Sequence, residues 1–173
     1  MNEVIQNLIE RRSARHYGPR QVEPEVLDQI LLAGTYAPTG MGRQSPVIVA
    51  VQDPDTVKQL SRMNAAIMGS DGDPFYGAPT VLVVLADKNV GTYLYDGSLV
   101  MGNLMNAAHA LGVDSCWIHR AKEEFESEEG KALLKKWGIQ GDLEGIGHCF
   151  LGYADTPKND PAPRKEGYVV KVL

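Results

Sequence analysis

The sequence predicts a single domain of the α+β class, and three observations support this expectation. Segments with helical periodicity and segments with the β-branched character of strands both occur, but they do not alternate regularly as in a doubly wound fold. A chain of 173 residues is long enough to bury a core of its own. Hydrophobic residues make up 43% and charged residues 23%, which is ordinary for a globular protein. We therefore expect one domain over residues 1–173.

Five helices are expected where apolar residues recur at helical spacing. In chain order, and with capping residues included, they span residues 3–12, 24–34, 53–68, 92–111 and 127–137. Pro24 and Pro54 each stand in a first helical turn, where a missing N–H costs nothing. Asp53 and Ser127 have side chains that cap a helix N-terminus.

The fourth expected helix, residues 92–111, is apolar around most of its circumference. A helix of this kind is buried on all sides. In a domain of this size, packing against a partner chain is one way to bury it. Gly97, Ser98, Gly102 and Ala108 would let another backbone come close.

Five strands are expected from β-branched and apolar runs. They span residues 47–51, 79–86, 115–119, 146–153 and 168–173. The run 79–86 is continuously apolar, as is typical of a central strand. The last strand follows an extended arm rich in Pro, Lys and Asp, residues 154–167, and has no obvious local partner. It could complete the sheet of a neighbouring subunit.

Composition disfavours several classes of protein. The longest apolar run, residues 78–86, is far too short to cross a bilayer. The N-terminus lacks a basic region followed by an apolar stretch, so no secretory signal is expected. The formal net charge is -5, whereas broad nucleic-acid binding needs an extended basic face. We expect a cytoplasmic protein without a membrane or nucleic-acid partner.

Metal and nucleophilic chemistry are also disfavoured. Cys116 with His119, and His148 with Cys149, are residue types that ligate zinc. Residues one or three apart in a strand point to opposite faces, so neither pair would converge on one ion. No Gly-x-Ser-x-Gly elbow is present, and Cys116 has only His119 as a local base. We expect no metal site and two buried strand cysteines.

One basic cluster stands out against the acidic background. It consists of Arg11, Arg12, Ser13 and Arg15. Guanidinium groups bind phosphate through paired hydrogen bonds, and a hydroxyl adds a further donor. Arginines at a helix end can instead simply favour the helix dipole, and the cluster alone does not choose between these interpretations.

Two further stretches favour the phosphate interpretation. A second basic pair, Arg164-Lys165, lies in the C-terminal arm. Between the two lies the loop Pro38-Thr39-Gly40 with Arg43-Gln44. Small residues and a carboxamide beside a basic residue suit a planar heteroaromatic ring with hydrogen-bonding edges. A ring at one end and a phosphate at the other describe a mononucleotide such as FMN.

The ordered motifs resemble those of the FMN-dependent nitroreductases over nearly the whole chain. Residues 11–15 are similar to the family's Arg-(Arg/His)-Ser-x-Arg stretch, which binds the FMN phosphate and ribityl chain. Residues 37–44 resemble its Ala-Pro-Ser-x-x-Asn-x-Gln loop along the flavin. Residues 96–112 resemble its dimer-core helix, and residues 112–118 the next strand, whose end approaches the flavin. Phe150-Leu-Gly-Tyr153 resembles its closing Leu-Gly-Tyr.

The resemblance implies a central, mostly antiparallel sheet flanked by helices, and an intertwined homodimer with C-terminal strand exchange. It implies FMN as cofactor, NADH or NADPH as electron donor, and ping-pong reduction of nitroaromatics, quinones or similar small acceptors. No catalytic side chain is expected, because flavin N5 carries the chemistry. The cofactor-binding residues that it implies are Arg11, Arg12, Ser13, Arg15, Pro38, Thr39, Gly40, Gln44, Trp117, Ile118, Arg164 and Lys165.

The chain departs from the family pattern at two places, and other functions stay open. Gly42 stands where the family commonly has Asn, and Ser45-Pro46 replaces the usual Pro-Trp. One alternative is a flavin-binding sensor or carrier without efficient NAD(P)H turnover. Another is a cofactor-free oligomeric module whose basic stretch binds a protein. Flavin destruction and dehalogenation stay open within the enzyme class.

Overall fold

A computed structural model describes residues 1–173. In chain order the elements are α1 (Glu3–Glu10), α2 (Pro24–Thr35), η1 (Gly40–Gly42), β1 (Pro46–Val51), α3 (Pro54–Met68), β2 (Thr80–Asp87), α4 (Tyr93–Ala110), β3 (Asp114–Ile118), α5 (Ala121–Glu126), α6 (Glu128–Lys136) and β4 (Leu143–Gly152). The strands form one sheet in the order β1-β2-β4-β3, and every neighbouring pair is antiparallel. The α+β class and the antiparallel sheet are confirmed.

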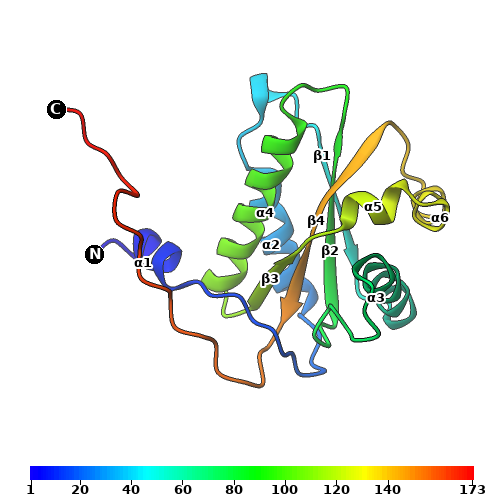
Figure 1. Cartoon of the computed structure of the whole chain (residues 1–173), viewed down its shortest axis with the longest axis horizontal. Helices are drawn as coiled ribbons and strands as arrows, with labels where there is room; N and C mark the ends of the chain where they lie inside the picture. The colour runs from blue at the N-terminus through cyan, green and yellow to red at the C-terminus, as the bar shows by residue number, and fades with distance from the viewer.

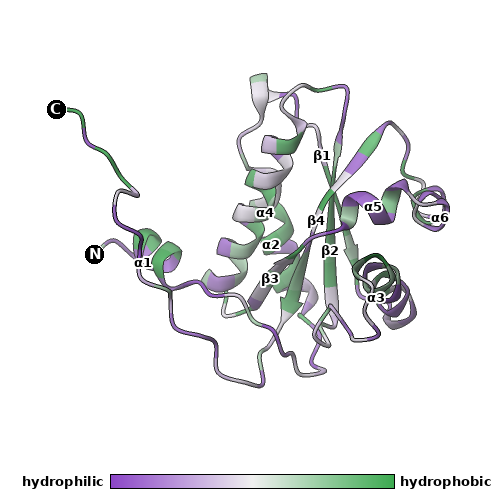
Figure 2. Cartoon of the chain, in the orientation of Figure 1, coloured by the Kyte–Doolittle hydropathy of each residue, from purple (hydrophilic) through white to green (hydrophobic).

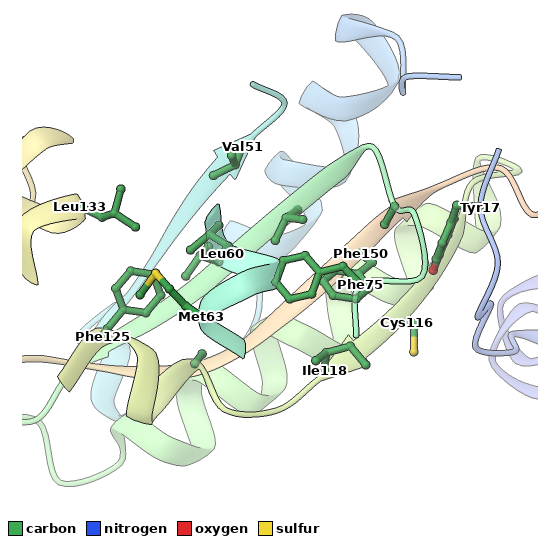
Figure 3. Packing of buried hydrophobic residues seen from close by; sticks show 14 of the residues in the cluster. Tyr17, Val51, Leu60, Met63, Phe75, Cys116, Ile118, Phe125, Leu133 and Phe150 are labelled. Atoms are coloured by element: carbon green, nitrogen blue, oxygen red, sulfur yellow. The ribbon is translucent and has the colours of Figure 1, made fainter. Parts of the chain in front are cut away.

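Helices cover both faces of the sheet (Figure 1). α2 and α4 pack on one face, where Leu27 and Leu104 belong to a cluster of buried hydrophobic residues. α3, α5 and α6 pack on the other face. Figure 3 shows the cluster there, with Phe75 beside Phe150 and Phe125 beside Met63. The central strand β2 is buried along nearly its whole length, as its apolar run predicts.

Most boundaries lie within three residues of those expected. The match is closest for α3, where Asp53 accepts a hydrogen bond from Thr56 N at 2.9 Å and caps the helix. One helix was missed, and one expected strand is absent from the chain by itself. α5 was not anticipated, and residues 168–173 form no strand, because the tail leaves the core and meets no strand edge of its own chain (Figure 1).

Exposed apolar residues lie on α1, on α4 and at the end of the tail. Figure 2 shows apolar residues in green along α1 and at the end of the tail. α1 has a strongly apolar face but buries no residue. α4 is not buried on all sides in the single chain, since Leu94, Tyr95 and Leu99 are exposed. None of the helices combines the length and the apolar character needed to cross a bilayer.

Candidate functional site

The basic cluster lies against the edge of the sheet. Residues 11–15 leave α1 and run beside β3, where Ala14 N donates to Ser115 O at 3.0 Å. A cavity of about 1010 Å³ separates this segment from the C-terminal arm. The predicted residues that line this cavity are Arg11, Arg12, Ser13, Arg15 and Arg164. The structure thus brings together residues about 150 positions apart in the chain.

Lys165 is not part of this lining. Its Nζ lies 5.5 Å from the ring centre of Tyr168, further along the exposed arm. The structure therefore places only one member of the predicted basic pair in the cavity.

Two neighbouring arginines in the cluster differ in their hydrogen bonding. Arg12 Nη1 donates to the main-chain oxygens of Ile9 and Arg11, at 2.6 and 2.8 Å, and so closes the end of α1. Arg11 Nη1 is buried and has no hydrogen-bond partner in the chain, and the same holds for Ser115 Oγ. A buried donor without a partner costs free energy. Arg11 also lines the cavity with Arg12, Arg15 and Arg164, so the guanidinium groups gathered there fit a phosphate group.

The second predicted segment, residues 38–44, turns sharply at η1. Met41, Gly42 and Gln44 all have positive φ, at 53°, 66° and 49°. Gly42 is the residue type that adopts such a conformation without strain, which is a local reason for glycine at this departure from the family pattern. Gly40 is also required, since a Cβ there would lie 2.3 Å from Thr92 Oγ1.

Asp96, in the first turn of α4, holds this loop. Its carboxylate accepts hydrogen bonds from Gly40 N at 3.0 Å, Ser45 Oγ at 2.8 Å and Thr92 Oγ1 at 3.1 Å. Burial of Asp96 opposes ionisation, but the bonds from Gly40, Ser45 and Thr92 outweigh it and lower its pKa. Ser45, the second departure from the family pattern, therefore helps to fix the loop.

Asp96 was not among the predicted site residues. The only signal in the sequence is a carboxylate near the start of a long apolar helix, and such a residue is ordinarily attributed to the helix dipole. Its contact with Gly40 joins residues 56 positions apart, which periodicity does not reveal.

The third predicted segment is the end of β3. Trp117 is half-buried, and its indole Nε1 is buried without a partner. The Ile118 side chain belongs to the core, so only its main chain could face a ligand. β3 is an edge strand, which leaves part of its main chain outside the sheet ladder.

The loop 38–44 and the basic cluster do not converge within one chain. The loop 38–44 is tied to the N-terminal end of α4, whereas α1 is tied to its C-terminal part by Asn7 Nδ2, which donates to Asn106 O at 3.0 Å. α4 has 18 residues and is therefore about 27 Å long. Figure 1 shows η1 and α1 at its opposite ends. Pro38 is exposed, and Thr39 and Gln44 line a separate cavity of about 290 Å³.

The cysteines offer no activated nucleophile. Burial raises the pKa of both Cys116 and Cys149, which keeps each thiol protonated. Both are free and buried, as expected from the sequence. No group of three or more His, Cys, Asp or Glu side chains could hold a metal ion.

Comparison with known proteins shows one family. The model of the Nitroreductase family matches residues 8–153. A protein of Archaeoglobus fulgidus, provisionally named as an NADH dehydrogenase/NAD(P)H nitroreductase, is 29% identical over 164 residues, which cover 92% of this chain and 90% of that protein. FMN reductase [NAD(P)H] of Bacillus subtilis is 37% identical over 90 residues, 51% of this chain and 34% of that protein.

A solved structure supports the same relationship. The nitroreductase of Bacteroides fragilis NCTC 9343, crystallised with bound FMN, superposes with a TM-score of 0.91. It is 28% identical in sequence, and the match covers 100% of both chains. The nitroreductase-like fold expected from the sequence motifs is confirmed.

Proposed function

The chain belongs to the nitroreductase family, and we propose that it is a flavin oxidoreductase that uses FMN to pass electrons from NADH or NADPH to small acceptors such as nitroaromatics or quinones. The observation that carries the proposal is the cavity of about 1010 Å³ that Arg11, Arg12, Arg15 and Arg164 line together with Ser13. A dianionic phosphate is the chemical group that such a cavity fits best.

In this proposal the basic cluster holds the phosphate end of the cofactor. Arg11 supplies a preformed donor, and Ser13 adds a hydroxyl beside it. Arg164 approaches from the C-terminal arm, so the arm closes over the phosphate. Arg15 adds positive charge to the cavity lining, and Lys165 adds it on the arm outside the lining. Arg12 contributes mainly by fixing the end of α1, from which this segment departs.

The ring end of the cofactor would meet Pro38, Thr39, Gly40 and Gln44 from one direction and the main chain at Trp117 and Ile118 from another. Because loop 38–44 lies at the far end of α4 from the basic cluster, we propose that the loop belongs to the second subunit of a homodimer. The exposed apolar faces of α1 and α4, and the apolar end of the tail, would be buried in that dimer. The tail could then pair with the partner's sheet.

When bound, FMN supplies the hydride and electron transfer, and the chain supplies binding and orientation. Asp96 keeps the loop 38–44 in place through its hydrogen bond from Gly40 N, and the guanidinium groups of the basic cluster hold the phosphate.

Purified protein tests the proposal directly. Titration with FMN should saturate at one flavin per chain. The loaded protein should then oxidise NADH or NADPH when menadione or nitrofurazone is added. Protein that shows no change in flavin fluorescence on titration would overturn the proposal. Protein that binds flavin but turns over neither nucleotide would indicate a flavin carrier or sensor.

A further inference from the structure

Three buried polar side chains meet inside the hydrophobic core on the α3 and α5 side of the sheet. Asn64 comes from α3, Glu124 from α5 and His148 from β4, and each is 0% exposed. The rings of Phe75 and Phe125 flank His148, with ring centres 5.4 and 6.3 Å away. Polar groups in such surroundings cost free energy unless they are hydrogen-bonded.

The three side chains form one connected set of hydrogen bonds. His148 Nε2 lies 3.0 Å from Glu124 Oε2, and Glu124 Oε1 accepts from Asn64 Nδ2. Asn64 Nδ2 also donates to His119 O at 2.8 Å, and its Oδ1 accepts from Arg120 Nε at 2.8 Å. Carbonyl and carboxylate oxygens only accept and a guanidinium only donates, so these partners fix the orientation of the amide. Through Asn64, this hydrogen-bonded set therefore contacts two consecutive residues, His119 and Arg120, which form a turn.

This turn joins β3 to α5 in a strained conformation. Arg120 has φ 79° and ψ 4°, in the left-handed region, which costs a residue with a side chain about 1–2 kcal/mol. Next to the turn, the start of α5 approaches β4 closely, since a Cβ at Gly145 would lie 2.2 Å from Ala121 O. The two hydrogen bonds of Asn64 therefore hold a conformation that the turn would otherwise leave.

The turn borders a cavity of about 320 Å³ at the end of β3. His119 and Arg120 line the cavity together with Trp117, while Leu94 and Ser98 of α4 lie on another side. In the proposed function the main chain at Trp117 meets the cofactor ring. Movement of the turn would thus reshape the space beside that ring.

We propose that Asn64, Glu124 and His148 are positioning residues that hold the His119–Arg120 turn in the geometry with which the nicotinamide donor or the acceptor meets the cofactor ring. The inference rests on the proposed function, since it concerns the ring end of the same site. His148 orients Glu124, Glu124 orients the Asn64 amide, and Asn64 fixes the turn. The effect on the reaction is indirect, because none of the three side chains reaches the cavity lining.

The test compares Asn64→Leu and Glu124→Leu with Glu124→Gln, each loaded with FMN. Both Leu variants should slow anaerobic reduction of the bound flavin by NADH or NADPH by as much as about 100-fold, which is what misplacement by about 1 Å can cost. They should also change the visible circular dichroism of the flavin. The dissociation constant for FMN should change little, because the phosphate cluster is elsewhere. Glu124→Gln keeps an acceptor for Asn64 and should recover most of the rate.

Thr80→Val is the matched control. Thr80 is also 0% exposed, and its hydroxyl donates to Gln21 Oε1 at 2.7 Å and accepts from Gln52 Nε2 at 3.0 Å. Its variant should lose thermal stability but keep the wild-type rate of flavin reduction and the same circular dichroism. Equal slowing in Thr80→Val and Asn64→Leu would show that only stability matters and would overturn the inference.

Reduction at the wild-type rate in a folded Asn64→Leu variant would also overturn it. If Asn64→Leu does not fold, the rates of flavin reduction and the circular dichroism of Glu124→Leu and Glu124→Gln are compared instead, and the same criteria apply. A wild-type protein that binds no FMN or is not reduced contradicts the proposed function instead, so the two failures are distinguishable.

Discussion

Replacement of Arg11 by Ala should weaken FMN binding without weakening the fold. Arg11 Nη1 is buried and unpartnered, so its desolvation penalty is already present in the protein without cofactor. Hydrogen bonds to charged groups contribute about 1.5–3 kcal/mol, so the dissociation constant for FMN should rise about 10-fold to 150-fold. Arg11→Lys keeps the charge but loses the planar fork, and its effect should be intermediate.

Arg12→Ala is the matched control for this prediction. Arg12 Nη1 donates to the main-chain oxygens of Ile9 and Arg11. Its loss should therefore fray the end of α1 and should weaken FMN binding less than the loss of Arg11 does. Fluorescence titration of each variant with FMN gives the dissociation constant, and thermal unfolding without FMN gives the stability. A larger loss of affinity in Arg12→Ala than in Arg11→Ala would refute the reasoning. So would a large loss of stability in Arg11→Ala without FMN.

Three further predictions concern the loop and the proposed dimer. Gly40→Ala would place a Cβ 2.3 Å from Thr92 Oγ1, so it should displace the loop and lower FMN affinity in titration; unchanged affinity would contradict the loop's role. Hydrogen bonds hold the pKa of Asp96 in the folded protein below the pKa of an aspartate in the unfolded chain, about 3.9. The ionised carboxylate therefore stabilises the fold above a pH of about 3.9, and this stabilisation is lost as the pH falls through the pKa of Asp96 in the folded protein. Asp96→Asn should therefore cost about 1.5–3 kcal/mol in urea unfolding at pH 7, and a deficit that does not shrink in acid would argue against this. Ile5→Glu places a charge on the exposed apolar face of α1 and should shift sedimentation toward the monomer, whereas an unchanged sedimentation profile would exclude α1 from the interface.

Local signals predicted most of the fold because they describe short stretches of chain. α3 was placed almost to the residue because Asp53 and Pro54 mark its start, and Gly69 follows its last residue in a left-handed conformation. α5 was missed because its 6 residues follow Arg120, an arginine in a conformation that glycine usually adopts. The tail was expected to be a strand from its β-branched residues, but a strand also needs a neighbour, and the chain by itself provides none.

The site was predictable as an ordered set of motifs but not as a geometry. The sequence motifs predict that Arg11 and Arg164 bind the same cofactor, but they do not show the cavity that both residues line. They also do not reveal that Arg12 donates to the last main-chain oxygens of α1 while Arg11 Nη1 is left without a partner. The contacts of Asn64 with residues 55 to 60 positions away are long-range consequences of packing, which periodicity cannot predict.

The central claim is that this chain uses FMN to take electrons from a nicotinamide nucleotide. The most direct measurement mixes the FMN-loaded protein with NADH or NADPH in the absence of oxygen and follows the visible absorbance of the oxidised flavin. The account predicts that the absorbance is lost rapidly with at least one nucleotide and returns when a quinone is added. Bound flavin that stays oxidised with both nucleotides would contradict it.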